Sequence, residues 1–347
     1  MKKYIALLLA LAMAFALCAC GDTVTGPGPA QNPNSEAPVS EPAGGPSEAP
    51  SEAPADETFV IGVCQQMAHP ALDLATQGFK DALAASGLKI EYKDADAGGE
   101  YANCGTIMDG FVSDGVDLIL ANATYPLQAA ASATADIPIL GTSITDYATA
   151  LELSDWNGTV GGNISGTSDL APLDQQAAMV KEVFPDAKNV GLLYCSGEPN
   201  SVYQITIVKE ALEGMGCTCT AYPFTDVNDL ASVTQTACDG SDVIYIPTDN
   251  TAAKYTDTIA NVVIPAKVPV VAGESGICSG CGVVTLSISY YDIGYTTGEM
   301  AAQILKGEAD ISTMPVQYAP EVTKMYNKAN CEALGITPPE GYEAIEG

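Results

Sequence analysis

Short apolar runs rich in Val, Ile and Leu occur at regular intervals along most of the chain. Runs of this length, bounded by Gly, Pro, Asn and Asp, predict buried β-strands. We expect strands at residues 59–64, 88–92, 117–121, 137–141, 189–194, 217–222, 242–246 and 268–272.

The segments between these runs have the apolar spacing of amphipathic helices. Three groups of residues each fall on one helical face: Leu72, Ala75, Phe79 and Leu83; Leu173, Ala177, Val180 and Phe184; and Ile205, Val208, Leu212 and Met215. Strands that alternate with helices predict an α/β fold built from parallel sheets.

One block of this pattern occurs twice. Asp114-Gly-Val-Asp117 begins an apolar run that is followed by a helix and a second run containing Ile137-Pro, and Asp239-Gly-Ser-Asp242 is likewise followed by a helix and Val268-Pro. A repeated strand–helix–strand block favours two similar doubly wound, Rossmann-like lobes over the alternative, one large doubly wound domain.

The N-terminus has the layout of a bacterial export signal. Lys2 and Lys3 precede an apolar run that ends at Cys20, and Leu17-Cys18-Ala19-Cys20 resembles a lipobox. We expect residues 1–20 to be a lipoprotein signal peptide and Cys20 to carry a lipid anchor on the extracytoplasmic face of the cell membrane. A plain cleaved signal peptide is the alternative.

Residues 21–57 lack apolar periodicity and contain Ser-Glu-Ala-Pro three times. Such a Pro/Ser/Glu-rich segment buries too little apolar surface to fold, so it predicts a disordered linker between the anchor and the lobes. An interaction tail with its own partner is the other interpretation.

Charge and cysteine content exclude several function classes. The net charge is −30 and all 13 basic residues are lysine, which argues against binding nucleic acid or anionic lipid through a basic patch. Eleven cysteines, less Cys18 and Cys20, leave an odd number, so at least one thiol is free. Cys278-Ser-Gly-Cys281 leaves a disulfide open, but with His69 as the single histidine we expect no metal site.

Enzyme signatures are weak in this sequence. A Ser–His–Asp arrangement would have to use His69, and no Gly-x-Ser-x-Gly motif surrounds a serine. The glycine-rich residues 158–166 match neither a dinucleotide fingerprint nor a P-loop, and they are interpreted as a flexible approach to a hinge. We therefore expect no catalytic residues, no enzymatic activity and no cofactor.

Ligands of doubly wound sheets bind outside the carboxyl ends of the strands. Applied to both lobes, this rule places a small-molecule ligand in the cleft between them. The ligand-binding residues expected after strand ends are Gln65, His69, Thr124, Tyr125, Thr142, Ser143, Asn200, Ser201, Tyr203, Asp249 and Glu274. Two of these have ordinary alternatives, because His69 can order the turn before Pro70 and Asp249 can cap a helix.

Several blocks together resemble the tryptophan/tyrosine-type substrate-binding proteins of ABC transporters, over residues 59–336. The matching blocks are His69-Pro-Ala-Leu-Asp73 with residues 78–83, Gly166-Thr-Ser-Asp169, Gly197-Glu-Pro-Asn-Ser201, Pro247-Thr-Asp-Asn250, and residues 290–294 with 297–307. Tyr125, Cys195 and the Cys278–Cys281 pair depart from that pattern, which leaves the side-chain pocket undefined.

The resemblance implies a periplasmic-binding-protein type I fold whose lobes are joined by three crossing strands near residues 163–168, 283–287 and 316–319. It places residues 58–165 and 285–317 in the N-terminal lobe and residues 166–284 and 318–347 in the C-terminal lobe. The helix of residues 290–306 would return to the first lobe. The lobes would close around an amino acid, often an aromatic one.

An amino acid imposes specific demands on a chain without arginine. The α-carboxylate is expected to meet Thr124, Thr142, Ser143 and Ser201 together with helix N-termini, whose dipoles favour anions. Asp249 is expected to pair with the α-ammonium. Tyr125 and Tyr203 are the candidates to stack on an aromatic side chain, with a core or rim role as the alternative.

We thus expect a monomeric lipoprotein that delivers an amino acid to the permease and ATPase subunits of an ABC importer. A nucleoside, a sugar or another small solute is the alternative ligand, although the lack of arginine and the single Trp156 weaken a sugar site. A surface sensor or adhesin that feeds no transporter is a further alternative.

Overall fold

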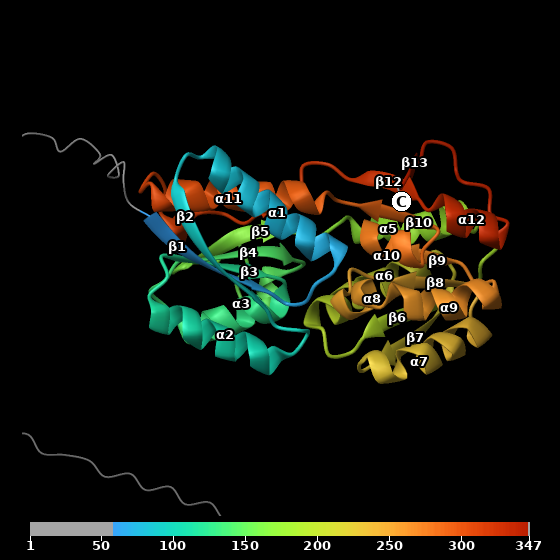
Figure 1. Ribbon diagram of the computed structural model, residues 1–347. Helices are drawn as coiled ribbons and strands as arrows, with labels where there is room; N and C mark the ends of the chain where they lie inside the picture. Colours follow the sequence, from blue (N-terminus) through green and yellow to red (C-terminus); the bar gives the residue numbers. More distant parts are fainter. Residues whose placement is uncertain (1–57, 346–347) are drawn as a thin grey trace, which may run out of the picture. The chain divides into compact units, whose positions relative to one another are not determined.

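The computed structural model describes residues 58–345, whose strands form two sheets (Figure 1). In spatial order, the first sheet consists of β2 (Lys89–Asp96), β1 (Thr58–Gln65), β3 (Leu118–Asn122), β4 (Ile139–Ile144), β5 (Ile164–Ser168) and β11 (Gln317–Tyr318). The second consists of β7 (Thr218–Phe224), β6 (Asn189–Cys195), β8 (Val243–Ile246), β9 (Val270–Ala272), β10 (Val284–Ser287), β12 (Thr323–Tyr326) and β13 (Glu343–Ala344). The predicted signal peptide, Cys20 and the linker lie outside the described residues.

Both sheets are doubly wound with the same strand order. The first five strands of each lobe, numbered along the chain, lie in the order 2-1-3-4-5 and are parallel. Only the β10–β12 pair among the described strand pairs is antiparallel. The predicted fold class and all eight predicted strands are confirmed. In this topology the switch points lie between β1 and β3 and between β6 and β8.

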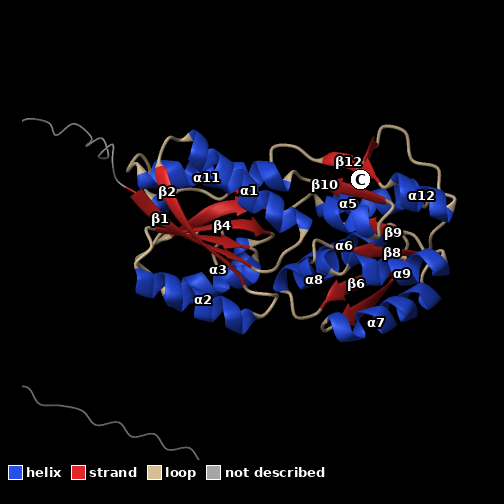
Figure 2. Cartoon of the chain, in the orientation of Figure 1, coloured by secondary structure: helices blue, strands red, loops and turns tan. Residues whose placement is uncertain are grey.

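Helices cover both faces of the first sheet (Figure 2). One face packs against α1 (Pro70–Ala85) and α11 (Tyr290–Leu305), and the other against α2 (Tyr101–Asp114) and α3 (Thr124–Ala133), with α4 (Tyr147–Ala150) beside α3. Because side chains alternate along a strand, Leu118 packs in the first core and Ile119 in the second. Strands buried on both faces explain the continuous apolar runs.

The second sheet is covered in the same way. One face packs against α5 (Leu173–Val183), α6 (Pro199–Gly214) and α12 (Lys328–Leu334). The other packs against α7 (Val227–Gly240), α8 (Asn250–Lys254), α9 (Thr256–Ala266) and α10 (Ser275–Gly280). A 3-10 helix, η1 (Ile311–Thr313), precedes β11. No helix within residues 58–345 has the length and apolar character needed to cross a membrane.

The repeated Asp-Gly-x-Asp blocks make equivalent contacts in the two lobes. Asp117 precedes β3 and its Oδ2 accepts a 2.7 Å hydrogen bond from the backbone N–H of Val60 in β1. Asp242 precedes β8 and its Oδ2 accepts a 2.8 Å bond from the backbone N–H of Asn189 in β6. Each aspartate therefore ties the start of a lobe's third strand to the start of its first.

Three short connections join the lobes: residues 169–172, 288–289 and 319–322. The predicted lobe limits need correction at all three, because β5 and β11 stay in the first sheet through Ser168 and Tyr318, and β10 stays in the second through Ser287. Residues 166–168 and 318 thus belong with the first lobe and residues 285–287 with the second. A strand keeps its hydrogen-bond ladder within one sheet, so the chain changes lobe only after the strand ends.

The helices α1 and α11 pack unusually close to each other. A Cβ atom added at Gly294 would overlap the backbone carbonyl oxygen of Ala75, and one added at Gly78 would overlap that of Tyr291. Glycine at these two positions lets the helix backbones meet. This contact fixes α11, which follows a lobe connection, on the first lobe.

The nine described cysteines are free thiols in the structure, Cys278 and Cys281 among them. Both of these lie in the core beneath α10, where the Cys281 thiol contacts the carbonyl oxygen of Ile277. Burial raises the pKa of the Cys278 thiol. These thiols therefore act as small buried hydrophobes in this arrangement.

Candidate ligand-binding site

A small pocket lies between the lobes at the carboxyl ends of their strands. Residues from both lobes line this inner pocket: His69, Leu72, Ser143, Thr145, Asp169, Asn200, Thr248, Asp249, Asn250, Ala253, Glu274 and Tyr290. They follow β1, β4, β5, β6, β8, β9 and β10, as expected for ligand sites in doubly wound sheets.

Buried polar atoms without a hydrogen-bond partner converge on the inner pocket. Within the described residues nine such side-chain atoms occur, and five of them belong to pocket residues: His69 Nδ1, Ser143 Oγ, Thr145 Oγ1, Asp169 Oδ1 and Asn200 Oδ1. Each of these residues is at most 7% exposed. Because buried polar groups are nearly always paired, a cluster of unpaired ones indicates a polar ligand site.

Ser143 reaches the inner pocket through a local distortion of β4. The register between β4 and β5 shifts between Gly141 and Ile144, and Ser143 has a φ of 57°. A bulge redirects side chains at a strand end, and left-handed backbone at a non-glycine residue is characteristic of functional sites. The distortion turns Ser143 into the pocket beside Thr145.

Asp169 stands at the first lobe connection with one oxygen committed and one free. The Tyr290 hydroxyl donates a 2.9 Å hydrogen bond to Asp169 Oδ2, whereas Oδ1 has no partner. Burial raises the pKa of the Asp169 carboxyl, and the nearby hydroxyls of Tyr290 and Thr145 oppose that rise. A cationic group at Oδ1 would satisfy the free oxygen and favour the carboxylate.

The other pocket acids are occupied by the protein itself. Asp249 Oδ2 accepts hydrogen bonds from Cys195 N–H at 2.6 Å and the Ser201 hydroxyl at 2.8 Å, and Asp249 Oδ1 accepts one from Ala252 N–H at 2.8 Å. Glu274 caps α10 through the N–H groups of Gly276 and Ile277. Neither carboxylate presents an unpaired oxygen.

The electrostatic balance of the inner pocket is strongly one-sided. Asp169, Asp249 and Glu274 line it, and no lysine or arginine does. Burial, with the nearby charge of Glu198, raises the pKa of Asp249 to about 7, and burial raises that of Glu274 to about 7. A ligand that carries a positive charge would lower the free energy of the ionised acids.

These raised pKa values predict a pH dependence of stability. An acid whose pKa is raised on folding binds more protons in the native state than in the unfolded state. Its contribution to the free energy of unfolding therefore falls as pH rises from about 4 to about 7. His69, whose pKa burial lowers, acts in the opposite direction below its ordinary value of 6.5. Between about pH 4 and 7, the Glu274 carboxyl should lower the free energy of unfolding by up to about 1 kcal/mol for each pH unit. We expect Glu274→Gln to abolish this pH-dependent loss.

The measurement is urea unfolding of the ligand-free protein at several pH values between 5 and 7.5. Glutamine keeps one of the two oxygens that cap α10. The lost cap bond lowers stability equally at every pH, so the pH dependence of the difference reports the charge. The stability difference between variant and wild type should grow with pH. A difference that stays constant would contradict the assignment.

Two contacts hold the lobes together on one side of the inner pocket. His69 Nε2 lies 3.2 Å from Asn250 Oδ1, and the Tyr125 hydroxyl donates a hydrogen bond to the carbonyl oxygen of Gly197. With these contacts formed, the inner pocket measures only about 10 Å³, roughly one water molecule's worth of space. A larger ligand enters this pocket only if the lobes move or the side chains shift.

The structure brings together five of the residues predicted from the sequence. His69, Ser143, Asn200, Asp249 and Glu274 line the inner pocket. Ser201 lies behind it, bonded to Asp249. Thr124 is buried in the first turn of α3, Tyr203 packs partly buried on the core beneath α6, and neither lines the pocket.

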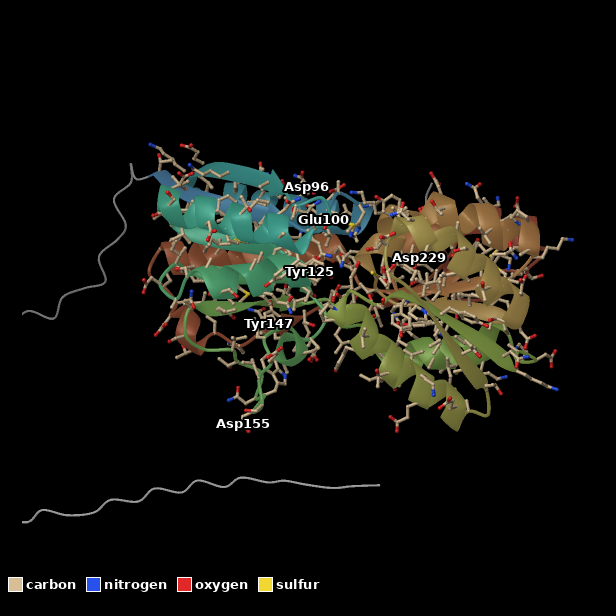
Figure 3. The ribbon with its side chains drawn as sticks, turned by 90° about the horizontal axis from the view of Figure 1, so that it is seen from below. Asp96, Glu100, Tyr125, Tyr147, Asp155 and Asp229 are labelled. Atoms are coloured by element: carbon tan, nitrogen blue, oxygen red, sulfur yellow. The ribbon has the colours of Figure 1, made fainter. Side chains whose placement is uncertain are left out.

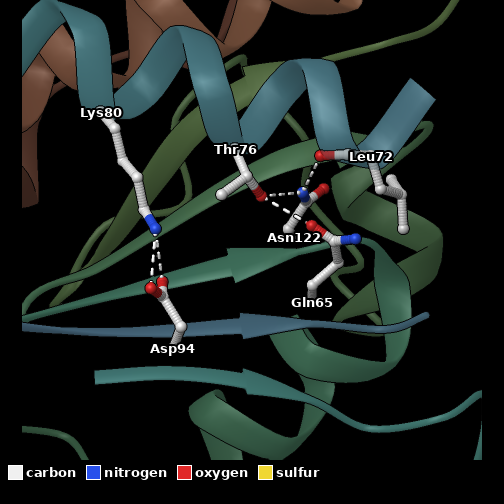
Figure 4. A network of polar contacts seen from close by, with 6 residues as sticks. All are labelled: Gln65, Leu72, Thr76, Lys80, Asp94 and Asn122. Atoms are coloured by element: carbon white, nitrogen blue, oxygen red, sulfur yellow. Dashed lines mark hydrogen bonds and ion pairs between the residues drawn. The ribbon is translucent and has the colours of Figure 1, made fainter. Parts of the chain in front are cut away.

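Gln65 and Thr142 are turned away from the inner pocket. Gln65 Nε2 donates to Asp73. Gln65 Oε1 accepts from Thr76, which joins β1 to α1 (Figure 4). Asn122 Nδ2 donates to Leu72 and Thr76 in the same network. Thr142 faces α11, with its hydroxyl 3.2 Å from that of Thr167. Successive side chains of a strand point to opposite faces of the sheet. Closeness to a strand end therefore does not by itself place a side chain in the pocket.

Several pocket residues were missing from the sequence-based set. Thr145, Thr248 and Asn250 follow predicted strands and belong to the same strand-end signal. Asp169 follows β5, and Tyr290 is the first residue of α11; both lie beside connections between the lobes. The signal for Asp169 was the strand before it, Ile164-Ser-Gly-Thr-Ser168, whose polar composition hid it.

Within residues 58–345, no group of three or more His, Cys, Asp and Glu side chains has the arrangement of a metal site.

The chain is similar to known proteins over nearly all of this region. The family described as ABC transporter substrate binding protein matches residues 60–344. A tyrosine-binding protein of Clostridioides difficile (strain R20291) is 31% identical over 282 residues, which cover 80% of this chain and 81% of the relative.

Two solved structures show the same arrangement of lobes to different degrees. An ABC domain in complex with L-Trp from Streptococcus pneumonia is 32% identical, with a TM-score of 0.79 over 83% of this chain and 100% of that chain. The ligand-free, open structure of a substrate binding protein with adhesive properties from Clostridium difficile is 33% identical, with a TM-score of 0.64 over 83% and 99%. At equal identity, the lobes described here resemble the complex more closely than the open form.

Proposed function

This chain belongs to the family of ABC transporter substrate-binding proteins, and we propose that it binds an aromatic amino acid, tyrosine or tryptophan, between its lobes. Substrate-binding proteins of ABC transporters are extracytoplasmic solute-binding proteins. The observation that carries the ligand class is the unpaired, buried oxygen of Asp169 in a pocket lined by three acids and by no lysine or arginine.

The pocket has the groups that an amino-acid head group needs. Asp169 Oδ1 accepts from the α-ammonium, with Oδ2 held by Tyr290. The α-carboxylate accepts from the unpaired hydroxyls of Ser143 and Thr145. The first turn of α1, whose N-cap His69 makes no side-chain cap bond, adds a favourable dipole.

This proposal changes two roles expected from the sequence. Asp169 replaces Asp249 as the partner of the ammonium, because the Asp249 oxygens are already paired within the second lobe. Thr145 replaces Thr124, Thr142 and Ser201, which do not line the pocket. Ser143 keeps its role.

Aromatic side chains are proposed from the relatives. One is named for tyrosine and another was solved with L-Trp, each more than 30% identical to this chain. We further propose that the chain delivers its ligand to a permease and ATPase as a monomer without enzymatic activity. The lipid anchor at Cys20 belongs to the same proposal and is supported by the lipobox in the sequence.

A ligand that binds only the native protein raises its stability. At ~100 times its dissociation constant, tyrosine or tryptophan should add about 2.7 kcal/mol, a shift of several degrees in Tm. Thermal unfolding with each aromatic amino acid measures the shift, and calorimetry gives the affinity.

N-acetyl tyrosine is the matched control for this experiment, because it keeps the ring and carboxylate but lacks the ammonium. It should produce little or no shift. If tyrosine, phenylalanine and tryptophan all leave Tm unchanged, the aromatic ligand class is wrong. An equal shift with N-acetyl tyrosine would reject the role of Asp169.

An adhesive role is the second candidate, favoured by the adhesive properties stated for the Clostridium difficile neighbour. Adhesion through the outer surface would be independent of the inner pocket. Binding of the purified protein to cultured epithelial cells, compared between wild type and Asp169→Asn, separates the two roles: unchanged adhesion with lost ligand binding would show that they are distinct.

A further inference from the structure

A second and much larger cavity opens between the lobes beside the inner pocket. This outer pocket measures about 390 Å³, and the residues that define it here are Met67, Tyr101, Tyr125, Val227, Lys254 and Tyr255. We propose that it receives the aromatic side chain of the ligand whose head group lies in the inner pocket. The inference rests on the proposed function and extends it to ligand selectivity.

The first argument is space. The inner pocket, at about 10 Å³, has no room for an aromatic ring, and its apolar lining is limited to Leu72, Ala253 and the Tyr290 ring. The outer pocket lies within the range of about 300–1,000 Å³ that is usual for small-molecule sites. An aromatic ring fits within this volume without a change in either core.

The second argument is adjacency. At four points along the chain, residues close in sequence line the inner and the outer pocket: Met67 and His69, Glu198 and Asn200, Asn250 and Thr251, and Ala253 and Lys254. The two pockets are therefore adjacent and share these segments of the chain as a common boundary.

This boundary includes contacts between the lobes, His69 with Asn250 and Tyr125 with Gly197. Contacts of this kind break when the lobes separate, so the open cleft joins the two pockets. A ligand that enters the open cleft can place its head group on one side of this line and its side chain on the other.

The third argument is the chemistry of the lining. The rings of Tyr101 and Tyr125 meet edge to face with centroids 5.5 Å apart, and Tyr255 and Met67 add apolar surface. The rest of the lining is largely polar and includes the charged residues Glu100, Glu198, Asp226 and Lys254. Figure 3 shows Tyr125 and Glu100 on the first lobe near its junction with the second. Aromatic rings bind one another in edge or offset arrangements, so this lining suits an aromatic side chain.

A competing compartment lies on another side of the inner pocket. It measures about 290 Å³ and shares His69 and Ala253 with the inner pocket, but its lining contains no aromatic residue. Small side chains such as Ser279 line it. It therefore supplies a matched control for the proposal.

The experiment fills each compartment with an indole. Val227→Trp, in the first turn of α7, fills the outer pocket, and Ser279→Trp fills the competing one. Calorimetry measures L-tyrosine binding, and displacement measures L-alanine, whose methyl group stays at the head-group site. Val227→Trp should weaken tyrosine binding at least about 10-fold, as expected when one well-buried ring loses its place, and should leave alanine unchanged.

Ser279→Trp should bind both amino acids like the wild type. The proposal is overturned if Ser279→Trp weakens tyrosine binding and Val227→Trp does not, or if both leave it unchanged. Should Val227→Trp fail to fold by thermal unfolding, Val227→Phe provides the smaller filling change with the same expected direction. A wild-type protein that binds no amino acid would instead reject the proposed function itself.

Discussion

Asp169→Asn is expected to weaken amino-acid binding at least about 30-fold while leaving the fold intact, because losing one partner of a buried charge pair costs about 2–5 kcal/mol. Asparagine keeps an oxygen that can accept from Tyr290, so the local geometry is preserved. The change also removes a buried carboxyl whose pKa is raised by burial. The variant should therefore be at least as stable as the wild type without ligand.

Asp249→Asn is the matched control for that variant. Asp249 lines the same pocket and is equally buried, but its oxygens accept from Cys195, Ser201 and Ala252. Its replacement should mainly lower stability, with a smaller effect on affinity. If calorimetry finds the reverse, with Asp249→Asn failing to bind and Asp169→Asn binding normally, the ammonium belongs to Asp249 as the sequence alone suggested.

Gly294→Val is expected to destabilise the protein by about 3 kcal/mol, at the upper end of overpacking costs. Its added carbon would meet the backbone carbonyl of Ala75, which cannot rotate away as a side chain could. Relief requires α1 and α11 to separate, and that would disturb the core between them. Urea unfolding monitored by circular dichroism measures the loss.

Gly110→Val is the control for the packing effect. Gly110 lies in α2, where an added Cβ has no neighbour within 4 Å. Both variants replace a helical glycine by the same residue, so their difference isolates the helix–helix contact. Equal unfolding midpoints for the two variants would contradict the close-packing explanation.

Apolar periodicity predicted the first four strands of each lobe, and it failed at the fifth strand of each, β5 and β10. The residues of β5 are all buried, yet most are Ser, Gly and Thr. Their hydroxyls are satisfied by the protein: Ser165 donates to the carbonyl of Met314, and Thr167 pairs with Thr297. A strand buried through hydrogen bonds has no hydrophobic signature, so the sequence pattern could not identify it.

The missed strand also explains the largest gap in the predicted site. The strand-end rule was applied to the strands predicted from apolar periodicity and not to the crossing that the family resemblance implied near residues 163–168, so Asp169 at the end of β5 was overlooked. At β4 the bulge decides that Ser143 and Thr145 face the pocket while Thr142 faces α11. Register shifts of this kind depend on the neighbouring strand and are not encoded in the local pattern.

The paired contacts of Asp117 and Asp242 bear on the history of the molecule. Each aspartate stands one residue before its strand and accepts from the residue just before the ladder of the neighbouring strand, Val60 in one lobe and Asn189 in the other. Identical local solutions at matching topological positions are expected when a gene for one lobe is duplicated and fused. The shared strand order of the two sheets and the repeated Asp-Gly-x-Asp block agree with such a duplication.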